Sequence, residues 1–203
     1  LLYDTQNRPE FHRRVLSAGW HYNWRPQNHH DQYQLDLIDL NYVFMPWISE
    51  TFRREYLENS SNYNAILRYN YEDLFIMKWG YTLSYTSQPL TGATGSYGTN
   101  AYSIRFSAES AGNLLYGFTS LFHTNQNSQN QYTLLNIAYA QYIKGDFDFA
   151  KSFRFSAENS LSVHFGLGIA YPYGNSSILP YEKRYFSGGA NSVRGWSVRG
   201  LGP

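Results

Sequence analysis

The sequence lacks cysteine, is poor in charged residues and contains no long apolar run. The absence of cysteine excludes a disulfide scaffold and a thiolate metal site. A transmembrane helix needs about 18 or more consecutive apolar residues, and no such run is found. The formal net charge of +1 gives no reason to expect nucleic acid as a partner, because phosphate binding needs a clustered basic surface.

Aromatic residues, by contrast, are abundant. They make up 19% of the chain, with 20 tyrosines, whereas charged residues make up only 15%. Two classes fit this composition. One is a soluble, tyrosine-rich β-sandwich, which would need a second sheet to cover its apolar face. The other is an outer-membrane β-barrel, in which lipid-facing and lumen-facing residues alternate and the mean hydropathy therefore stays low, here −0.52.

Alternating hydrophobicity favours the barrel. From Leu161 to Tyr171, every odd position is large and apolar, and every even position is small or polar. Side chains alternate between the two faces of a strand, so this segment is predicted to be a strand with one apolar face. The same pattern extends over Ile137 to Phe155, and this segment is longer than the about 9–11 residues that a membrane strand needs.

The fold class predicted is all-β, an antiparallel meander of about six strands belonging to a larger transmembrane barrel. The strands are expected near residues 11–25, 32–45, 72–88, 100–112, 135–156 and 160–172, with a stub at 1–3. The alternation slips phase between Leu37 and Leu40, which indicates a β-bulge near Ile38. Residues 1–203 are treated as one partial barrel domain, with no internal domain boundary.

The connections between these strands alternate in length. Outer-membrane barrels have short periplasmic turns and longer extracellular loops. The short connections are therefore assigned to the periplasm, and residues 46–71, 113–133 and 173–203 to the cell surface. Within the first long connection, Ser49 is a candidate N-cap for a short helix through Leu57.

The last connection carries a recognisable motif. Residues 176–203 read SSILPYEKRYFSGGANSVRGWSVRGLGP. This segment resembles the sixth extracellular loop of the BamA/TamA family, whose signature is P-x-x-x-x-F/Y-x-x-G-G-x-x-S-V/I-R-G-F/Y/W. The matching residues are Pro180, Tyr185, Phe186, Gly188, Gly189, Ser192, Val193, Arg194, Gly195 and Trp196. The continuation over residues 198–203 most resembles the Bacteroidota branch of that family, the TamL-like proteins.

The resemblance implies a sixteen-strand barrel preceded by periplasmic POTRA domains, of which the present strands would be the sixth to the eleventh. The chain would then end inside the sixth loop. The implied function is insertion or translocation of client proteins at the outer membrane of a Gram-negative bacterium, without ATP and without a cofactor. The implied partners are the lipid bilayer, client outer-membrane proteins, and periplasmic or lipoprotein accessory factors.

Arg194 is the central residue of this motif. In the family, the corresponding arginine points into the barrel lumen and is held by carboxylates and aromatic rings. The carboxylates usually credited lie on strands after the loop, so the lumen-facing acids available here are Glu109, Asp146 and Asp148. Gly188, Gly189 and Gly195 are expected to permit positive φ angles and close approach to the wall. The alternative is that Arg194 is an ordinary solvated loop arginine.

Other polar groups suggest weaker hypotheses. Asp146 and Asp148 share one face of a strand and could act in acid–base chemistry, but the favoured interpretation is a mixed-charge lumen that they form with Lys144 and Arg154. The pair at positions 29–30, both histidine, lacks a third metal ligand. His21 and His164 are interpreted as polar lumen lining.

No Gly-x-Ser-x-Gly motif and no convincing Ser-His-Asp set occurs, so the chain is predicted not to be an enzyme, which argues against an outer-membrane phospholipase or protease. An outer-membrane transport barrel, either a porin or a plugged receptor, is the remaining alternative. It would share the strand pattern but not the motif from Ser192 to Trp196.

Overall fold

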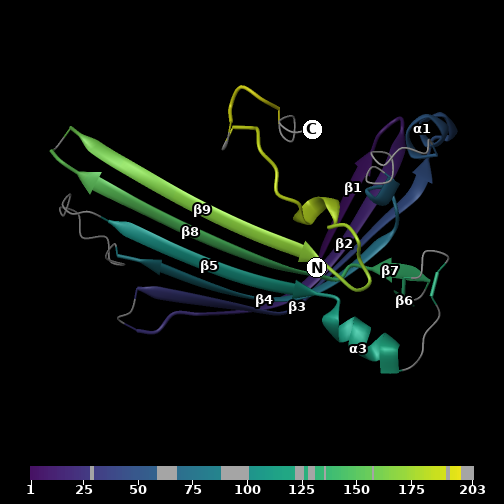
Figure 1. The fold of residues 1–203 in the computed structure, drawn as a ribbon, viewed down its shortest axis with the longest axis horizontal. Helices are drawn as coiled ribbons and strands as arrows, with labels where there is room; N and C mark the ends of the chain where they lie inside the picture. Colours follow the sequence, from purple (N-terminus) through teal and green to yellow (C-terminus); the bar gives the residue numbers. More distant parts are fainter. Residues whose placement is uncertain are drawn as a thin grey trace.

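The computed structural model describes residues 1–27, 30–58, 68–87, 101–121, 126–127, 131–134, 136–156, 158–190 and 193–197. They form one strongly curved, open sheet in the order β1-β2-β3-β4-β5-β8-β9, and all neighbours along this path are antiparallel (Figure 1). The long strands are β1 (Leu2–Asn7), β2 (Phe11–Trp24), β3 (Asp31–Ile48), β4 (Leu74–Thr86), β5 (Tyr102–Ala111), β8 (Tyr142–Arg154) and β9 (Ser160–Pro172). The predicted all-β meander is thus confirmed.

Two strand predictions need correction. The stub expected at the start is a full strand, β1, paired with β2 along its whole length. The long strand expected from Ile137 to Phe155 is interrupted at Ala140 and Gln141, which separate β7 (Ile137–Tyr139) from β8. A further short strand, β6 (Thr133–Leu134), pairs with β7.

The interruption has a geometric cause. β5 ends at Ala111, opposite Lys78, so the first residues of β4 extend beyond the end of β5. β7 fills this space by running parallel to β4, with Leu74 opposite Ala138. The backbone N–H of Ala140 donates to the Phe75 carbonyl oxygen at 2.9 Å, after which the chain moves across to pair with β5 as β8.

The bulge expected near Ile38 is present. Trp20 of β2 lies opposite Ile38, whereas the next residue, His21, lies opposite Asp36, so that one residue of β3 has no counterpart. The pairing of β3 with β4 shifts over the same residues, between Asp36 and Asp39. This shift explains the phase slip, because an extra residue moves the following side chains to the other face.

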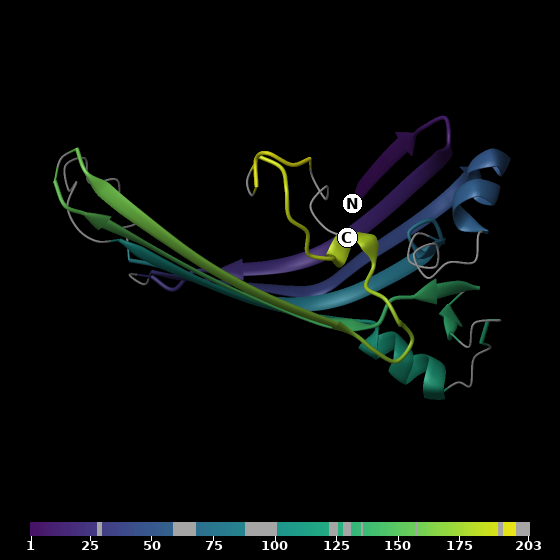
Figure 2. The same cartoon turned by 45° about the horizontal axis from the view of Figure 1, so that its top comes forward.

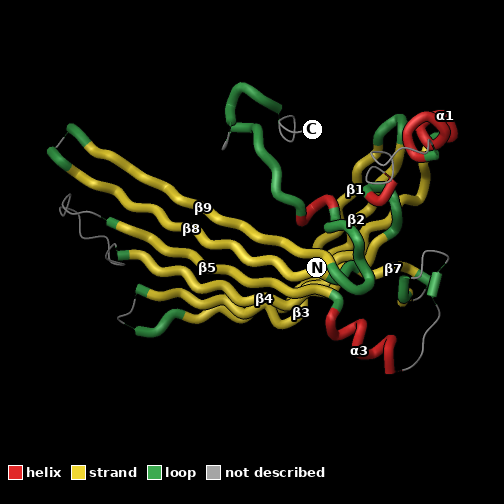
Figure 3. Tube along the Cα trace, viewed as in Figure 1, coloured by secondary structure: helices red, strands yellow, loops and turns green. Residues whose placement is uncertain are grey.

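Helical turns lie in the long connections (Figure 3). The helix predicted after Ser49 is present as α1 (Glu50–Phe52) continuing into the π-helical turn η1 (Arg53–Leu57), but the Ser49 side chain forms no capping hydrogen bond. α3 (Asn113–Leu121), which follows β5, was not predicted. In the described part of the chain, no helix has the length and apolar character needed to cross a membrane.

The apolar side chains of β9 are left exposed, as the alternation predicted. On β9, the odd-numbered side chains are exposed: Leu161 by 50%, Val163 by 45%, Phe165 by 54%, Leu167 by 53% and Ile169 by 65%. No second sheet covers them in the described residues, which argues against a β-sandwich. The opposite, concave face carries the polar residues, and the segment after β9 lies over it (Figure 2).

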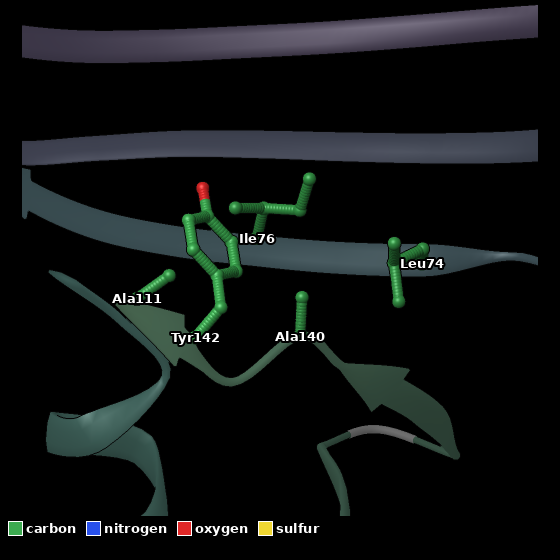
Figure 4. Packing of buried hydrophobic residues seen from close by; sticks show 5 residues of the cluster. All are labelled: Leu74, Ile76, Ala111, Ala140 and Tyr142. Carbon is green, nitrogen blue, oxygen red and sulfur yellow. The ribbon is translucent and has the colours of Figure 1, made fainter. Parts of the chain in front are cut away.

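A small hydrophobic core lies where β4, β5 and β8 meet at the long-loop end. It consists of Leu74, Ile76, Ala111, Ala140 and Tyr142 (Figure 4). Tyr69 and Leu179 pack against this cluster from the connecting segments. Leu179 of the segment after β9 therefore packs on this apolar cluster, which helps to hold the segment on the concave face.

Candidate functional site

The candidate site is the segment of residues 173–197, hereafter the docked segment, together with the concave residues that it contacts. After Pro172 the chain turns back over the sheet, and residues Tyr181–Lys183 form a short 3₁₀ helix, η2 (Figure 1). Glu182 forms an ion pair with Arg13 of β2. The segment thus spans from the last strand of the sheet towards the second.

Asn175 fixes the beginning of the docked segment. This side chain is only 5% exposed, and its amide donates to the carbonyl oxygens of Tyr132 and Tyr139, each at 2.9 Å. Its amide oxygen accepts from the Tyr132 backbone N–H at 2.6 Å. Gln141, at the break between β7 and β8, accepts the Asn175 backbone N–H and donates its own backbone N–H to Ser176. The irregular backbone around Gln141 thereby finds hydrogen-bond partners in the docked segment.

Lys183 attaches the middle of the segment to the sheet. Its ammonium lies 3.1 Å from a carboxylate oxygen of Glu109 on β5. Glu109 also lies 3.3 Å from Lys78 on β4, and Lys78 lies 3.1 Å from Asp39 on β3. Tyr142 adds a hydrogen bond to Glu109 at 3.0 Å. The result is a chain of alternating charges across three strands that ends on the docked segment.

The environment of Lys183 opposes its charge. Burial lowers the pKa of this ammonium, and the positive charges of Lys78 and Lys144 act in the same direction, while Glu109 opposes them. An ammonium in this position needs its carboxylate partner, since an unpaired buried charge is costly. Glu109 is therefore the group that makes the position of Lys183 tolerable.

Tyr185 provides the next contact. Its hydroxyl donates to Asp146 at 2.5 Å and lies 3.3 Å from the Gly145 carbonyl oxygen. Lys144 lies 4.3 Å from the centre of its ring, a cation–π distance. Burial, followed by the bond to Asp146, raises the pKa of the Tyr185 hydroxyl and keeps it a donor.

The Tyr185 ring lies over Gly168 of β9. A Cβ atom on Gly168 would be 2.5 Å from this ring, closer than real contacts allow. Glycine at this concave position of β9 therefore makes room for the ring.

The motif residues form a local turn. Gly188 and Gly189 have φ angles of 102° and 92°, as expected. The Gly189 N–H donates to the Trp196 carbonyl oxygen at 2.9 Å, and the Trp196 N–H donates to the Val193 carbonyl oxygen at 3.1 Å. The expectation for Gly195 is not met, because it has no positive φ and a Cβ there would point into open space. Ser192 lies outside the described residues.

The predicted acids face the concave side, but the structure gives them partners other than Arg194. Glu109 is held by Lys78 and Lys183, and Asp146 accepts from Tyr185. Asp148 lies 3.3 Å from His164. The Arg194 guanidinium instead donates to the Ala190 carbonyl oxygen at 3.2 Å, within its own turn. The cation of the docked segment that contacts Glu109 is Lys183, which lies earlier in the segment than Arg194.

The structure also locates most of the histidine residues that the sequence singled out. His21 lies 2.9 Å from Asp36, so it and His164 both serve as polar lining paired with an acid. Position 29, one half of the histidine pair, lies outside the described residues. Among the described residues, no group of three or more histidine, aspartate or glutamate side chains could hold a metal ion.

Sequence reasoning missed Asn175, Gly168 and Lys183 as parts of this site. Gly168 carried a usable signal, since glycine at a concave strand position often marks the close approach of another group. Lys183 lies within the recognised motif segment but at a position that the motif leaves variable. Asn175 is an asparagine in a polar stretch, and nothing in the sequence distinguishes it from a surface residue.

A known protein family matches most of this chain. No curated protein matches this chain. A family model, the Omp85 superfamily domain, matches residues 8–203, which include the sheet from β2 onwards and the whole docked segment. The chain therefore belongs to the Omp85 superfamily.

Proposed function

We propose that this chain forms part of the membrane barrel of an outer-membrane factor that inserts or translocates client proteins without ATP. Membership of the Omp85 superfamily supports an outer-membrane assembly or translocation role. The observation that carries the proposal is the docked segment, anchored to the concave face by Lys183 and Tyr185. We further propose that the barrel is of the BamA/TamA type, has sixteen strands and comes from the TamL-like Bacteroidota branch.

The physical problem of such a factor is the strand edge. A client strand cannot enter lipid with unpaired backbone groups, because each unsatisfied group costs several kcal/mol there. A barrel that opens its own seam can offer an edge to the client, which is a form of β-augmentation. The docked segment would brace the inner wall while the seam opens, since it connects β2, β5, β8 and β9 through side-chain contacts.

The proposed partners follow from this mechanism. They are the lipid bilayer around the convex face, client outer-membrane proteins, and periplasmic or lipoprotein accessory factors. The alternative is a transport barrel, a porin or a plugged receptor. Single-channel conductance of the intact protein separates a porin from the proposed function: the assembly factor should give a small or fluctuating conductance, and a porin a large, stable one.

Arg194 provides the direct test of the motif. In the intact protein, Arg194→Ala should leave the strands formed but lower the yield of outer-membrane proteins in cells that carry only the variant, or lower the stability of the barrel. Barrel stability is read from the heat-modifiability shift on gels. Arg25→Ala is the matched control, because Arg25 bonds Gln32 across a turn at the opposite end of the sheet. Wild-type values for Arg194→Ala in both assays would mean that this arginine has no special role.

A further inference from the structure

Lys151 is the one charged side chain on the convex face of β5, β8 and β9, three strands that the structure describes completely. It lies directly opposite Tyr102 of β5 and Val163 of β9. Directly opposed residues of antiparallel strands project from the same face of a sheet. Lys151 therefore shares a face with the exposed apolar row of β9, whereas Lys144 and Asp146 of the same strand contact the docked segment on the other face.

The Lys151 side chain leans towards one end of the sheet. Its Nζ atom lies 4.6 Å from the centre of the Phe153 ring, and it forms no ion pair within the described residues. Phe153 is nearer to the turn that joins β8 and β9. This turn lies at the opposite end of the sheet from α3 and η2 (Figure 1). A lysine stem that covers apolar surface in this way brings its charged end to a polar boundary.

Tyrosine hydroxyls are available beside Lys151. By the pairing geometry, the Cβ atoms of Lys151 and Tyr102 are about 5 Å apart. Tyr102 in turn contacts Tyr85 of β4, with ring centres 5.4 Å apart and hydroxyl oxygens 3.4 Å apart. Aromatic residues of this kind gather at the head-group level of a bilayer. An ammonium group with neighbouring hydroxyl donors suits a phosphate, whose oxygen atoms accept hydrogen bonds from both.

The length of β8 agrees with a position at the edge of the bilayer. Ile143 and Tyr171, which lie opposite each other, are the last exposed apolar pair at the long-loop end. At about 3.4 Å per residue, Lys151 lies about 27 Å from Ile143 along the strand. A strand tilt of about 40° reduces this to about 21 Å of depth, and the apolar band of outer-membrane barrels is about 25 Å tall. Lys151 is thus near the head groups of the leaflet at the turn end.

We propose that Lys151 binds the phosphate of an anionic phospholipid in this leaflet, with the Tyr102 hydroxyl beside it. An anionic head group is favoured because a zwitterionic one carries its own ammonium, which repels that of Lys151. The acyl chains of the bound lipid extend over the convex pair of Phe149 and Phe165 towards the middle of the bilayer. The inference rests on the membrane placement in the proposed function and adds a lipid site to it.

The absence of cysteine from the chain allows a test with one fluorescent label at Phe165→Cys, where an acyl chain of the bound lipid should lie. The intact protein is reconstituted in mixtures of phosphatidylglycerol and phosphatidylcholine, with brominated acyl chains, which quench the label on contact, on one lipid and then on the other. The two series give the relative affinity of the lipids next to the label. Phosphatidylglycerol should be preferred about fivefold. Lys151→Gln in the same background should abolish this preference.

Arg154→Gln is the matched control, because it removes a positive charge from the same end of β8 but from the concave face, and it should keep the preference. A label at Ile169→Cys, on the same row at the long-loop end, should show none. Equal quenching by both lipids at Phe165→Cys, or an equal effect of Lys151→Gln and Arg154→Gln, would overturn the site. Absence of quenching at both labels would contradict the membrane placement itself, and with it the proposed function.

Discussion

Lys183 of the docked segment lies 3.1 Å from Glu109 of β5, and the same carboxylate lies 3.3 Å from Lys78 of β4. One acid thus serves two cations, and both ammonium groups are less than a fifth exposed. Hydrogen bonds to charged groups at such positions contribute about 1.5–3 kcal/mol each. This contact should therefore contribute strongly to holding the segment on the concave face.

Glu109→Gln should release the docked segment. The substitution keeps the shape of the side chain but leaves Lys78 and Lys183 without their shared negative charge. Trypsin, which cleaves after lysine and arginine, should then reach Lys183 and Arg184 in the membrane-embedded protein. A loss of about 1.5–3 kcal/mol corresponds to cleavage roughly tenfold to a hundredfold faster.

The control for this experiment is Glu158→Gln in the exposed turn between β8 and β9. It removes the same charge from the protein but not from the concave face. Equal cleavage rates in both variants would show that the pair of Lys183 and Glu109 does not hold the segment.

Gly168→Ala should displace Tyr185. The added Cβ would lie 2.5 Å from the tyrosine ring, so the ring must leave its position and lose its bond to Asp146. Gly145→Ala is the matched control, since a Cβ there meets only the Ser107 carbonyl oxygen at 3.9 Å. The trypsin assay should show faster cleavage for Gly168→Ala alone. Wild-type cleavage of that variant would mean that Tyr185 is not essential for docking.

The strands could be predicted from the sequence because a one-sided membrane strand imposes strict alternation. Leu161 to Tyr171 obey it at every position, and β9 was found where the pattern placed it. The break at Gln141 could not be predicted, because Tyr139 and Ile143 keep the same phase on both sides of it. It depends on where β5 ends, which is a relationship between strands distant in sequence.

The site was predicted in outline only. The motif located the segment, and two of the three candidate acids, Glu109 and Asp146, contact it, whereas Asp148 contacts His164. Which cation meets which acid depends on the path of the segment across the sheet. The sequence assigned Arg194 to these acids by resemblance, whereas the structure places Lys183 beside Glu109.

Asn175→Ala should destabilise the base of the docked segment. It removes the amide that donates to the half-buried carbonyl oxygen of Tyr132 and to the buried one of Tyr139. Leaving a buried polar group unsatisfied costs about 1–3 kcal/mol. The heat-modifiability shift of the intact barrel should therefore occur at a lower temperature than in wild type. Ser177→Ala, two residues further and exposed, should leave the transition unchanged. Identical transitions for both variants would contradict the role given to Asn175.

A covalent link between positions 109 and 183 should restore the protease resistance of the docked segment that Glu109→Gln removes. The double variant Glu109→Cys/Lys183→Cys lacks both charges, so trypsin should cleave after Arg184 as fast as it does at that site in Glu109→Gln. A short bifunctional thiol reagent can join the two sulfur atoms specifically, because the chain contains no other cysteine.

If the segment braces the wall throughout the working cycle, the crosslinked protein should regain both protease resistance and client assembly in a reconstituted assay. The single variant Lys183→Cys, treated with the same reagent, controls for modification of the thiol alone. Restored protection without restored assembly would show that the segment must leave the wall during function, and the bracing role would then be wrong.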